Sequence, residues 1–490
     1  MKITVIGGGF SGLAAAALLS NQGNEVTILE KNRHVGGRAD YHTAHGFSFD
    51  LGPTWYLMGQ VIDDLFRELG ENRENYYDLV RLDPMFRVIT PQGYRDVKAG
   101  FEDSLNTFEK MSPGSSEDVT KLLVESRRAY EIMSSKLQDD GNQSESIQLR
   151  NWAYNQLKKF NLLRSYHGFL KQSLKSQEIK DLLETIPMQL GLNPVLLPAF
   201  HIFWLASLFD DGLWYPVGGF KKVVESLEKL ALSQGVDILC SENVSKININ
   251  KGKIKGVTTK EETFFADSVV SAMDYAFTET KLVPYIYRTY PKTYWKSAAY
   301  SSSAIIMNFG VQGNLGDSLA VHNVFIDENW HDFCLKLKSK KSTDNIQFFA
   351  TLSSLADKSL APEGCSCLRV VLPFPTGMKM DINRLSELRQ AVIEKIERHV
   401  GKRLDIVYEQ IKPPGYYKSR FNAYNSSAFG LAHTTSQNVV MRPPNKSLKV
   451  SGLYYVGQDT KPGVSIPFVI TSARTVADEI KKSSNHARRR

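Results

Sequence analysis

The chain has 490 residues, of which 42% are hydrophobic and 23% are charged, and its formal net charge is +8. Such a composition can bury a large core, which excludes an intrinsically disordered protein, and the length predicts more than one structural unit. No motif of interleaved aromatic and basic residues accompanies the positive charge, so we expect no nucleic-acid partner. We interpret the three basic residues Arg488–Arg490 as a solvated end of the sequence, with attraction to an anionic lipid surface as the alternative.

The four cysteines, Cys240, Cys334, Cys365 and Cys367, are too few for a disulfide-rich secreted protein. Cys365 and Cys367 form a C-x-C pair without the second pair that a zinc site of this kind needs, so the sequence predicts no metal site. The N-terminus leads straight into a strand and lacks the features of a signal peptide. We therefore expect a reducing, cytoplasmic location.

The first 31 residues follow the order strand, glycine turn, helix, strand, acid. The β-branched run Lys2–Ile6 leads into a turn in which Gly7 permits the tight bend and Gly9 leaves room for a pyrophosphate. Gly12 lets the following helix pack close to the strand, and the start of that helix offers free N–H groups to phosphate. Glu30 ends the second strand and can accept hydrogen bonds from a ribose. This combination predicts a dinucleotide site.

A second glycine-containing segment follows. Gly36 and Gly37 allow a tight backbone turn against a ligand, and Arg38 can reach a pyrophosphate. A short strand then ends at Pro53-Thr54-Trp55. A simple nicotinamide-binding domain does not need this segment.

The next part of the chain has helical patterns. We expect an amphipathic helix over 60–82, strands over 81–97 and mainly helices over 101–177. The stretch Met188–Phe209 is the most apolar part of the chain and is as long as a membrane span, but two prolines and a glycine argue against a spanning helix. We interpret it as buried core or the lining of an apolar pocket, with monotopic insertion and a true span as alternatives. We interpret His201, within it, as a hydrogen-bonded core histidine.

Strand patterns return in the second half of the chain. Successive strands over 236–272 end in the buried run Ser268–Ala272, which predicts that the first sheet resumes here after a long insertion. Further strands over 300–372 predict a second sheet, and Leu385–Val400 is amphipathic and helical. The C-terminal segment repeats the opening order: the strand Leu453–Tyr455 runs through Gly457 into a turn, and a helix follows over 468–481.

The C-terminal turn can serve the far end of a long cofactor. Asp459 could bond a polyol chain or a pyrophosphate, and free N–H groups over Val464–Phe468 could stabilise negative charge on a reduced flavin ring. Asp274 either contacts the ligand or caps the residues that follow it. Three separate segments devoted to one ligand favour FAD over NAD.

A family resemblance rests on these segments. The residues Gly7-x-Gly9-x-x-Gly12, Glu30 and Gly36-Gly37-Arg38 resemble the first FAD-binding motif of the amine-oxidase superfamily. The later blocks at 49–55, 215–219, 359–365, 427–431 and 453–463 resemble bacterial phytoene-type carotenoid desaturases, over residues 1 to about 480. Among the subgroups the chain is most similar to the hydroxycarotenoid 3,4-desaturases, and phytoene or diapophytoene desaturases remain alternatives. Residues 458–461 depart from the pattern, which has small residues and often a histidine there.

The resemblance implies an α/β fold. A Rossmann-type FAD-binding domain would consist of the interleaved segments 1–75, 212–290 and 431–490. An α+β substrate domain would have an apolar helical region over 76–211 and a mixed sheet over 291–430. It also implies that Glu30 binds the adenosine ribose, that the backbone of Val244 faces the adenine, and that Pro53–Trp55 and Val464–Pro467 lie by the flavin ring. The full set of expected FAD-binding residues is Gly7, Gly9, Phe10, Ser11, Gly12, Glu30, Lys31, Gly37, Arg38, Pro53, Thr54, Trp55, Val244, Asp274, Gly457, Asp459, Val464, Ser465, Ile466 and Pro467.

The implied reaction is carotenoid desaturation by hydride transfer to the flavin and loss of a proton. We expect an apolar carotenoid substrate, peripheral attachment to membrane lipid, and oxygen or a quinone as electron acceptor. No side chain is predicted to act as a catalytic acid or base. Alternatives are another enzyme on the amine-oxidase scaffold, a non-catalytic isoprenoid lipid carrier, and a nicotinamide dehydrogenase.

Overall fold

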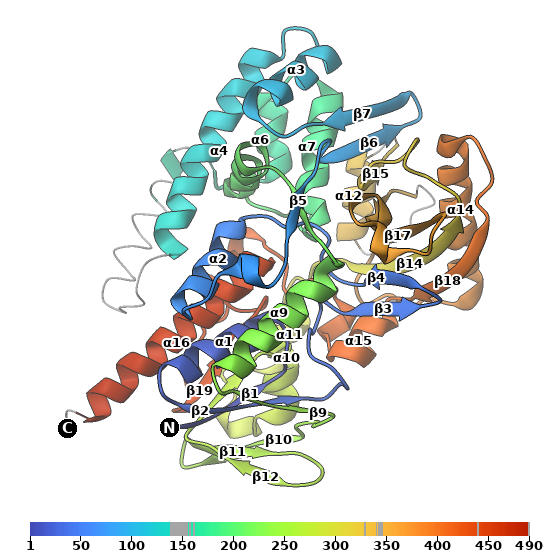
Figure 1. Ribbon diagram of the computed structural model, residues 1–490. Helices are drawn as coiled ribbons and strands as arrows, with labels where there is room; N and C mark the ends of the chain where they lie inside the picture. The colour runs from blue at the N-terminus through green and yellow to red at the C-terminus, as the bar shows by residue number, and fades with distance from the viewer. Residues whose placement is uncertain are drawn as a thin grey trace.

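The computed structural model describes residues 1–137, 155, 158–159, 162–327, 330–339, 341, 346–438 and 441–488 (Figure 1). Part of the predicted helical stretch 101–177 and the last two arginines of the basic C-terminus lie outside the described residues. The described residues form two large sheets, a three-stranded sheet and two strand pairs, with a group of helices beside them, as the α/β prediction requires (Figure 1).

The first sheet is parallel and gathers strands from three distant parts of the chain. Its order is β19-β13-β1-β2-β9, so the predicted return to the first sheet is confirmed by the pairing of β13 with β1. A small antiparallel sheet, β10-β11-β12, lies next to it (Figure 1). These strands are β1 (Lys2–Ile6), β2 (Glu25–Glu30), β9 (Asp237–Cys240), β10 (Lys246–Asn250), β11 (Lys253–Thr258), β12 (Thr263–Phe265), β13 (Ser268–Ser271) and β19 (Leu453–Tyr455).

Helix α1 (Phe10–Asn21) is the centre of this layer. Every residue from Phe10 to Leu19 is buried, because α9 (Gly219–Ser233) and α16 (Ile466–Arg488) both pack against it. The run Ala14–Ala17 has side chains small enough for such close approach on several sides. The C-terminal helix is therefore longer than predicted and forms part of the layer around the first sheet.

The second sheet has seven strands in the order β18-β14-β17-β16-β15-β6-β7. All neighbours are antiparallel except β15 and β6, so the sheet is mixed, as predicted. One face packs Ile305 and Met307 against α14 (Ile382–Val400), and the opposite face carries Ala304. The strands are β6 (Phe86–Thr90), β7 (Gly93–Val97), β14 (Ser303–Gln312), β15 (His322–Phe325), β16 (Phe348–Leu352), β17 (Cys365–Phe374) and β18 (Ile406–Lys412).

The apolar stretch Met188–Phe209 lies inside the protein. It begins at the end of α7 and continues through a loop, a 3-10 turn (Ala199–Ile202), α8 (Phe203–Ala206) and a π turn (Ser207–Asp211). The prediction of buried core is confirmed for this stretch, because nearly all of its large apolar side chains are buried. The alternatives of monotopic insertion and of a span by this stretch are wrong, since it is already packed against protein. No helix among the described residues is long and apolar enough to cross a bilayer.

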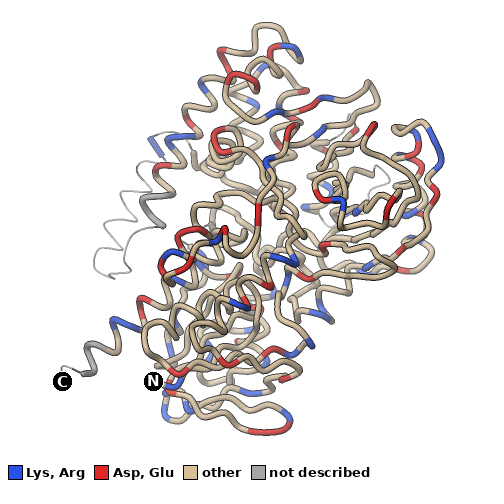
Figure 2. Tube along the Cα trace, viewed as in Figure 1, with Lys and Arg blue, Asp and Glu red and all other residues tan. Residues whose placement is uncertain are grey.

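The remaining elements surround these layers. The predicted helix over 60–82 is too long: α2 ends at Glu68, Gly70 follows with φ +78°, and β5 then pairs with β8. In Figure 2, positive and negative residues are both spread over the trace, with tan stretches between them. The other elements are α2 (Gly59–Glu68), α3 (Phe101–Met111), α4 (Ser116–Leu137), α6 (Tyr166–Ser173), α7 (Gln177–Gln189), α10 (Tyr275–Phe277), α11 (Lys292–Ser297), α12 (Trp330–Lys338), α13 (Ser353–Ala356), α15 (Gly415–Phe421), β3 (Tyr41–Ala44), β4 (Phe47–Asp50), β5 (Leu79–Arg81) and β8 (Trp214–Pro216), with short 3-10 or π turns at Arg73–Asn75, Thr278–Leu282, Tyr285–Tyr287, Lys358–Leu360, Tyr424–Ser426 and Thr435–Gln437.

Candidate functional site

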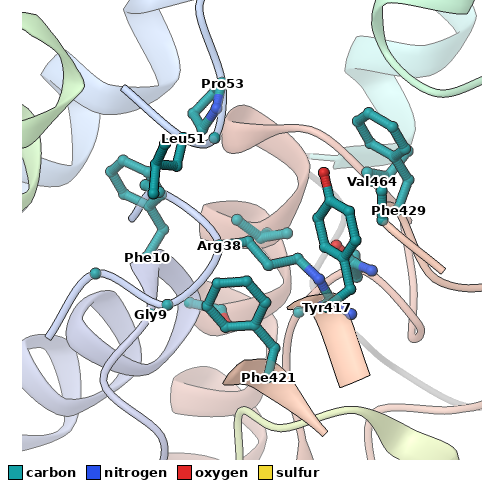
Figure 3. Close-up of a pocket in the computed structure, with 18 of the residues that line it drawn as sticks. Gly9, Phe10, Arg38, Leu51, Pro53, Tyr417, Phe421, Phe429 and Val464 are labelled. Carbon is teal, nitrogen blue, oxygen red and sulfur yellow. The ribbon is translucent and has the colours of Figure 1, made fainter. Parts of the chain in front are cut away.

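One large cavity runs from the glycine turn after β1 to the face of the second sheet. Figure 3 shows Gly9 and Phe10 on one side of it and Tyr417, Phe429 and Val464 on the other. Eighteen of the twenty residues predicted to bind FAD line this cavity, and the two exceptions are Gly12 and Asp459. The lining residues from this set are Gly7, Gly9, Phe10, Ser11, Glu30, Lys31, Gly37, Arg38, Pro53, Thr54, Trp55, Val244, Asp274, Gly457, Val464, Ser465, Ile466 and Pro467.

The two glycine loops pack backbone against backbone at the nucleotide end. Gly7 has φ +99°, which a side chain rarely adopts, and the N–H of Gly36 donates to the carbonyl of Gly8 at 2.8 Å. A Cβ on Gly12 would lie 2.0 Å from the carbonyl oxygen of Gly7, so Gly12 acts in packing, as predicted, and not at the cavity wall. No side chain caps the start of α1 at Gly9, which leaves its first N–H groups free for a phosphate.

Glu30 is held rigidly at the cavity edge. Its Oε2 accepts the N–H of Gly8 at 2.8 Å, and its Oε1 accepts both the backbone N–H and the side-chain amide of Asn32. A carboxylate has about four lone-pair positions, so acceptor capacity remains for a ribose hydroxyl. The neighbouring Lys31 donates its Nζ to the carbonyl of Ser419 and to Asn422. Burial lowers the pKa of Lys31, while the charge of Glu30 opposes that shift.

The side chain of Arg38 tests whether an anionic cofactor fits the cavity. Its Nε and Nη2 are buried and have no hydrogen-bond partner among the described residues, and Figure 3 shows the side chain in the middle of the cavity. A buried guanidinium with free donors is unfavourable unless an anion pairs with it. The free N–H groups at the start of α1 and the close-packed glycines nearby also favour a bound anion. The residues present therefore fit a pyrophosphate.

Two carboxylates lie behind Arg38. Asp274 caps α10 by accepting the N–H of Phe277 at 2.9 Å, so the interpretation of a cap is confirmed. It also accepts the N–H of Tyr424 and lines the cavity, and its contact with a ligand stays a prediction. Asp459 does not line the cavity, and its oxygens accept the N–H groups of Leu431 and Tyr275, so its contact with a ligand stays a prediction. Burial, with the charge of Asp459 as the next cause, raises the pKa of Asp274 above its ordinary range.

The C-terminal turn is fixed by residues that the sequence motifs did not indicate. Arg442 is buried and donates to the carbonyls of Leu431, Gln458 and Thr460, which explains how the unusual 458–461 sequence keeps its shape. The N–H of Val464 donates to Nε2 of His433 at 3.3 Å. No local pattern marks Arg442, because its partners are backbone carbonyls from other parts of the chain.

His201 packs edge-on against His433, with ring centroids 4.9 Å apart. Burial lowers the pKa of His201 to about 3, so its ring is neutral at physiological pH. Neither ring nitrogen of His201 has a hydrogen-bond partner among the described residues. The interpretation of a core histidine is correct in its burial, but the predicted hydrogen bond is wrong.

The other end of the cavity is mostly apolar, and only part of it comes from segments that the sequence analysis singled out. Phe429 lies against Gly191, where an added Cβ would be 2.2 Å from its ring. Arg369 on β17 is a buried exception whose Nε lacks a partner in the described part of the chain, and burial lowers its pKa. Met188, Leu190 and Trp204 come from the apolar stretch that was predicted as core or pocket lining, and Phe429 lies in one of the blocks of the family resemblance. The lining residues that the sequence analysis did not single out include Phe349, Arg369, Val371, Tyr417, Arg420 and Phe421.

Comparison with known proteins assigns the chain to a family. Residues 10–481 match the model of the flavin-containing amine oxidoreductases. The chain belongs to this family. It is therefore an FAD-dependent oxidoreductase, as the three glycine-containing segments and the free donors of Arg38 had indicated. The nicotinamide dehydrogenase considered from the sequence is wrong.

Three known proteins illustrate how similar this chain is to others. A carotenoid 3,4-desaturase from Haloarcula japonica is 31% identical over 98% of this chain and 97% of its own. A 4,4'-diapophytoene desaturase from Staphylococcus aureus is 28% identical over 98% of this chain and 99% of its own. The crystal structure of an oxidoreductase from Methanosarcina mazei covers 97% of this chain and 99% of its own, with a TM-score of 0.66 and 20% identity, which supports the fold alone.

Proposed function

We propose that this flavoenzyme is a carotenoid desaturase that introduces a C=C bond next to an existing polyene, with a 1-hydroxycarotenoid desaturated at C3–C4 as the preferred substrate. The observation that carries the proposal is the 31% identity to a carotenoid 3,4-desaturase along almost the whole of both chains. The apolar end of the cavity supports it, because a long hydrocarbon needs an apolar wall. Desaturation of phytoene or diapophytoene is the second candidate, favoured by the 28% identity to a diapophytoene desaturase.

For the cofactor, we assign the ribose to Glu30, the pyrophosphate to Arg38 and the start of α1, the adenine to the backbone of Val244, and the ring to the turn Val464–Pro467 with Pro53–Trp55. Bound FAD supplies the acceptor for a hydride. The chain's own residues then hold two adjacent carbons of the substrate at the ring and exclude water from them, since Trp55, Phe349 and Phe429 line that part of the cavity.

The substrate itself accounts for the rest of the reaction. Loss of a hydride beside a polyene leaves a cation that is delocalised over the conjugated chain, and loss of the neighbouring proton then forms the double bond. Burial lowers the pKa of His201 and of His433, and neither residue lines the cavity, so neither is given a role toward the substrate. The proposal gives no side chain the role of catalytic base.

We also propose that FAD is held by one domain composed of residues 1–75, 212–290 and 431–490, and that residues 76–211 and 291–430 hold the carotenoid. The protein would collect this substrate at the cytoplasmic face of a membrane and pass electrons to oxygen or a quinone. Tyr285 and Ile286 support a lipid contact, since they are 76% and 69% exposed and adjacent in one short turn. Loss of vesicle binding in a Tyr285→Ser, Ile286→Ser variant would support this contact, and unchanged binding would contradict it.

The decisive experiment mixes the FAD-loaded enzyme anaerobically with a C40 1-hydroxycarotenoid saturated at C3–C4, or with a C30 diapophytoene. We expect bleaching of the flavin absorption with the first and a product two hydrogen atoms lighter by mass spectrometry. Bleaching only with the C30 compound would favour the second candidate. Tight carotenoid binding without bleaching would instead indicate a lipid carrier, and free FAD with each substrate is the control.

A further inference from the structure

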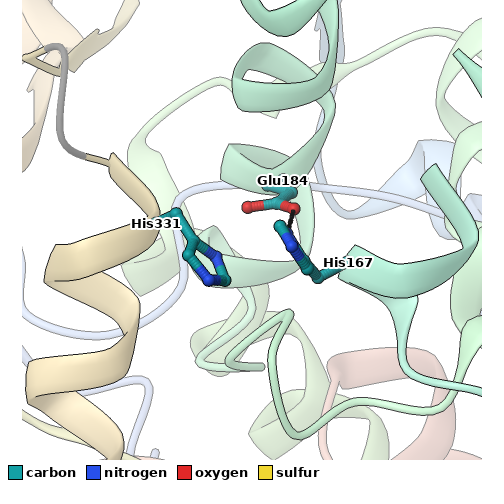
Figure 4. Close-up of side chains that lie close together, drawn as sticks. All are labelled: His167, Glu184 and His331. Atoms are coloured by element: carbon teal, nitrogen blue, oxygen red, sulfur yellow. Dashed lines mark hydrogen bonds and ion pairs between the residues drawn. The ribbon is translucent and has the colours of Figure 1, made fainter. Parts of the chain in front are cut away.

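Three potential metal ligands meet on helices α6, α7 and α12, outside the FAD cavity. They are His167, Glu184 and His331, and one ligand atom from each lies within 4.8 Å of the other two (Figure 4). Glu184 is 1% exposed, and the two imidazole rings are stacked with centroids 3.9 Å apart. We propose that this cluster is a binding site for a divalent transition metal, with zinc as the best match.

The first argument is an incomplete set of polar contacts. Oε1 of Glu184 lies 2.6 Å from Nδ1 of His167, but Oε2 of Glu184 is buried and has no partner among the described residues. Nδ1 of His331 is also buried and without a partner in that part of the chain. A buried carboxylate oxygen and an imidazole nitrogen that both lack partners are costly, and one cation satisfies both.

The second argument is the type of donor. Two imidazole nitrogens and one carboxylate oxygen are a ligand set that zinc uses in proteins, with a fourth position left for water. Bonds of about 2.0–2.1 Å to a tetrahedral ion place ligand atoms roughly 3.3 Å apart, so small side-chain rotations would gather the three atoms. The side chain of His167 is 25% exposed, which gives solvent, and hence an ion, access to the site.

The position of the cluster indicates a structural role for the metal. Glu184 lies one turn before Met188, which lines the FAD cavity, and His331 belongs to the helix that follows β15 of the second sheet. Apart from the cluster, Asn193 donates to the carbonyl of Cys334 at 2.8 Å across the same boundary. A bound ion would therefore fix the end of α7 against α12 and hold that wall of the cavity in place. This role depends neither on FAD binding nor on the identity of the substrate.

The sequence prediction of no metal site considered only the spacing of cysteines. The three ligands are at positions 167, 184 and 331, and no zinc motif has this spacing. Cys334 lies one turn after His331 on α12 and is fully buried, but it is not a member of the cluster. It therefore serves as the matched control on the same helix.

The test measures the zinc content of the FAD-loaded protein by mass spectrometry after zinc loading and dialysis. We expect one zinc ion per wild-type chain and at least about tenfold less in His331→Gln and Glu184→Gln. Cys334→Ala and the surface variant His45→Asn should retain zinc as the wild type does. Equal zinc in the wild type and His331→Gln would overturn the site, and loss of zinc in Cys334→Ala would overturn the ligand set.

Two further measurements keep the result clear if a variant folds poorly. X-ray absorption of the zinc-loaded wild type should show nitrogen and oxygen ligands at about 2.0–2.1 Å and no sulfur at about 2.3 Å. In chelator, Glu184→Gln should unfold at a temperature no lower than the wild type, because it removes a buried carboxylate that lacks a full set of partners. Zinc should raise the unfolding temperature of the wild type alone, and an equal rise in Glu184→Gln would contradict the proposal.

Discussion

The two ends of the main cavity are made in different ways. The nucleotide end consists of backbone and a few charged groups, with Gly9, Glu30 and Arg38 close together near the start of the chain. The opposite end is a wall of large apolar side chains that come from α7, α8, β16 and the loop at Phe429. A phosphate is recognised by donors in fixed positions, whereas a hydrocarbon needs only shape and the absence of water. Substitutions at the first end should therefore affect FAD binding, and those at the second end should affect turnover.

The largest expected effect is that of Gly12→Ala. Its Cβ would be 2.0 Å from a backbone oxygen that cannot move without breaking the turn at Gly7. We expect destabilisation of at least about 3 kcal/mol, or no soluble protein, measured by denaturant unfolding and flavin content. The control is Gly415→Ala, where a Cβ meets no atom within 4 Å. A stable Gly12→Ala protein with full flavin content would contradict the close packing of α1 on β1.

The next effect is that of Arg38→Met. Loss of the donors that face the cavity should weaken FAD binding by about tenfold to a hundredfold, as expected for charge-assisted hydrogen bonds. The stability of the FAD-free protein should stay the same or rise, because a buried cation without full pairing is removed. Titration of FAD by fluorescence quenching measures the first effect and thermal unfolding the second. Unchanged FAD affinity would show that Arg38 does not bind the pyrophosphate.

A substitution at the apolar end should lower turnover and leave FAD binding nearly unchanged. In Gly191→Ala the new methyl group would lie 2.2 Å from the ring of Phe429, so this ring, which lines the cavity, would have to move, and the φ of +73° at this position adds backbone strain. We expect the turnover of carotenoid to fall by about tenfold or more, because the substrate is displaced from the ring of the cofactor. Flavin content should stay close to that of the wild type, and equal loss of flavin and turnover would mean that the two ends are not separate.

The smallest effect concerns pH and the carboxylates behind Arg38. Since the folded state raises the pKa of Asp274, its contribution to stability is present below the ordinary carboxyl pKa of about 4 and is lost as the pH rises toward neutrality. The free energy of unfolding of the FAD-free wild type should fall over this range relative to Asp274→Asn. Parallel curves for the two proteins in urea titrations would show that Asp274 titrates normally.

The sequence could predict the nucleotide end because its determinants are local. Gly7, Gly12 and Glu30 act through a turn, a helix contact and a strand end within about thirty residues, and the structure places each as expected. Asp459 illustrates the limit, because its place in the C-terminal turn suggested a ligand contact, while its carboxylate binds the backbone of Tyr275 and Leu431. The direction of a short side chain in a loop depends on what packs around it.

By itself the sequence determined the dinucleotide motif, the return of the chain to the first sheet and the burial of an apolar stretch, because local periodicity and glycine positions encode them. Only the tertiary structure decided which apolar residues line the cavity, how Arg442 holds the C-terminal turn, and that His167, Glu184 and His331 meet. These groups come from helices and strands far apart in the chain. Their proximity is set by how whole layers pack, which no short sequence pattern records.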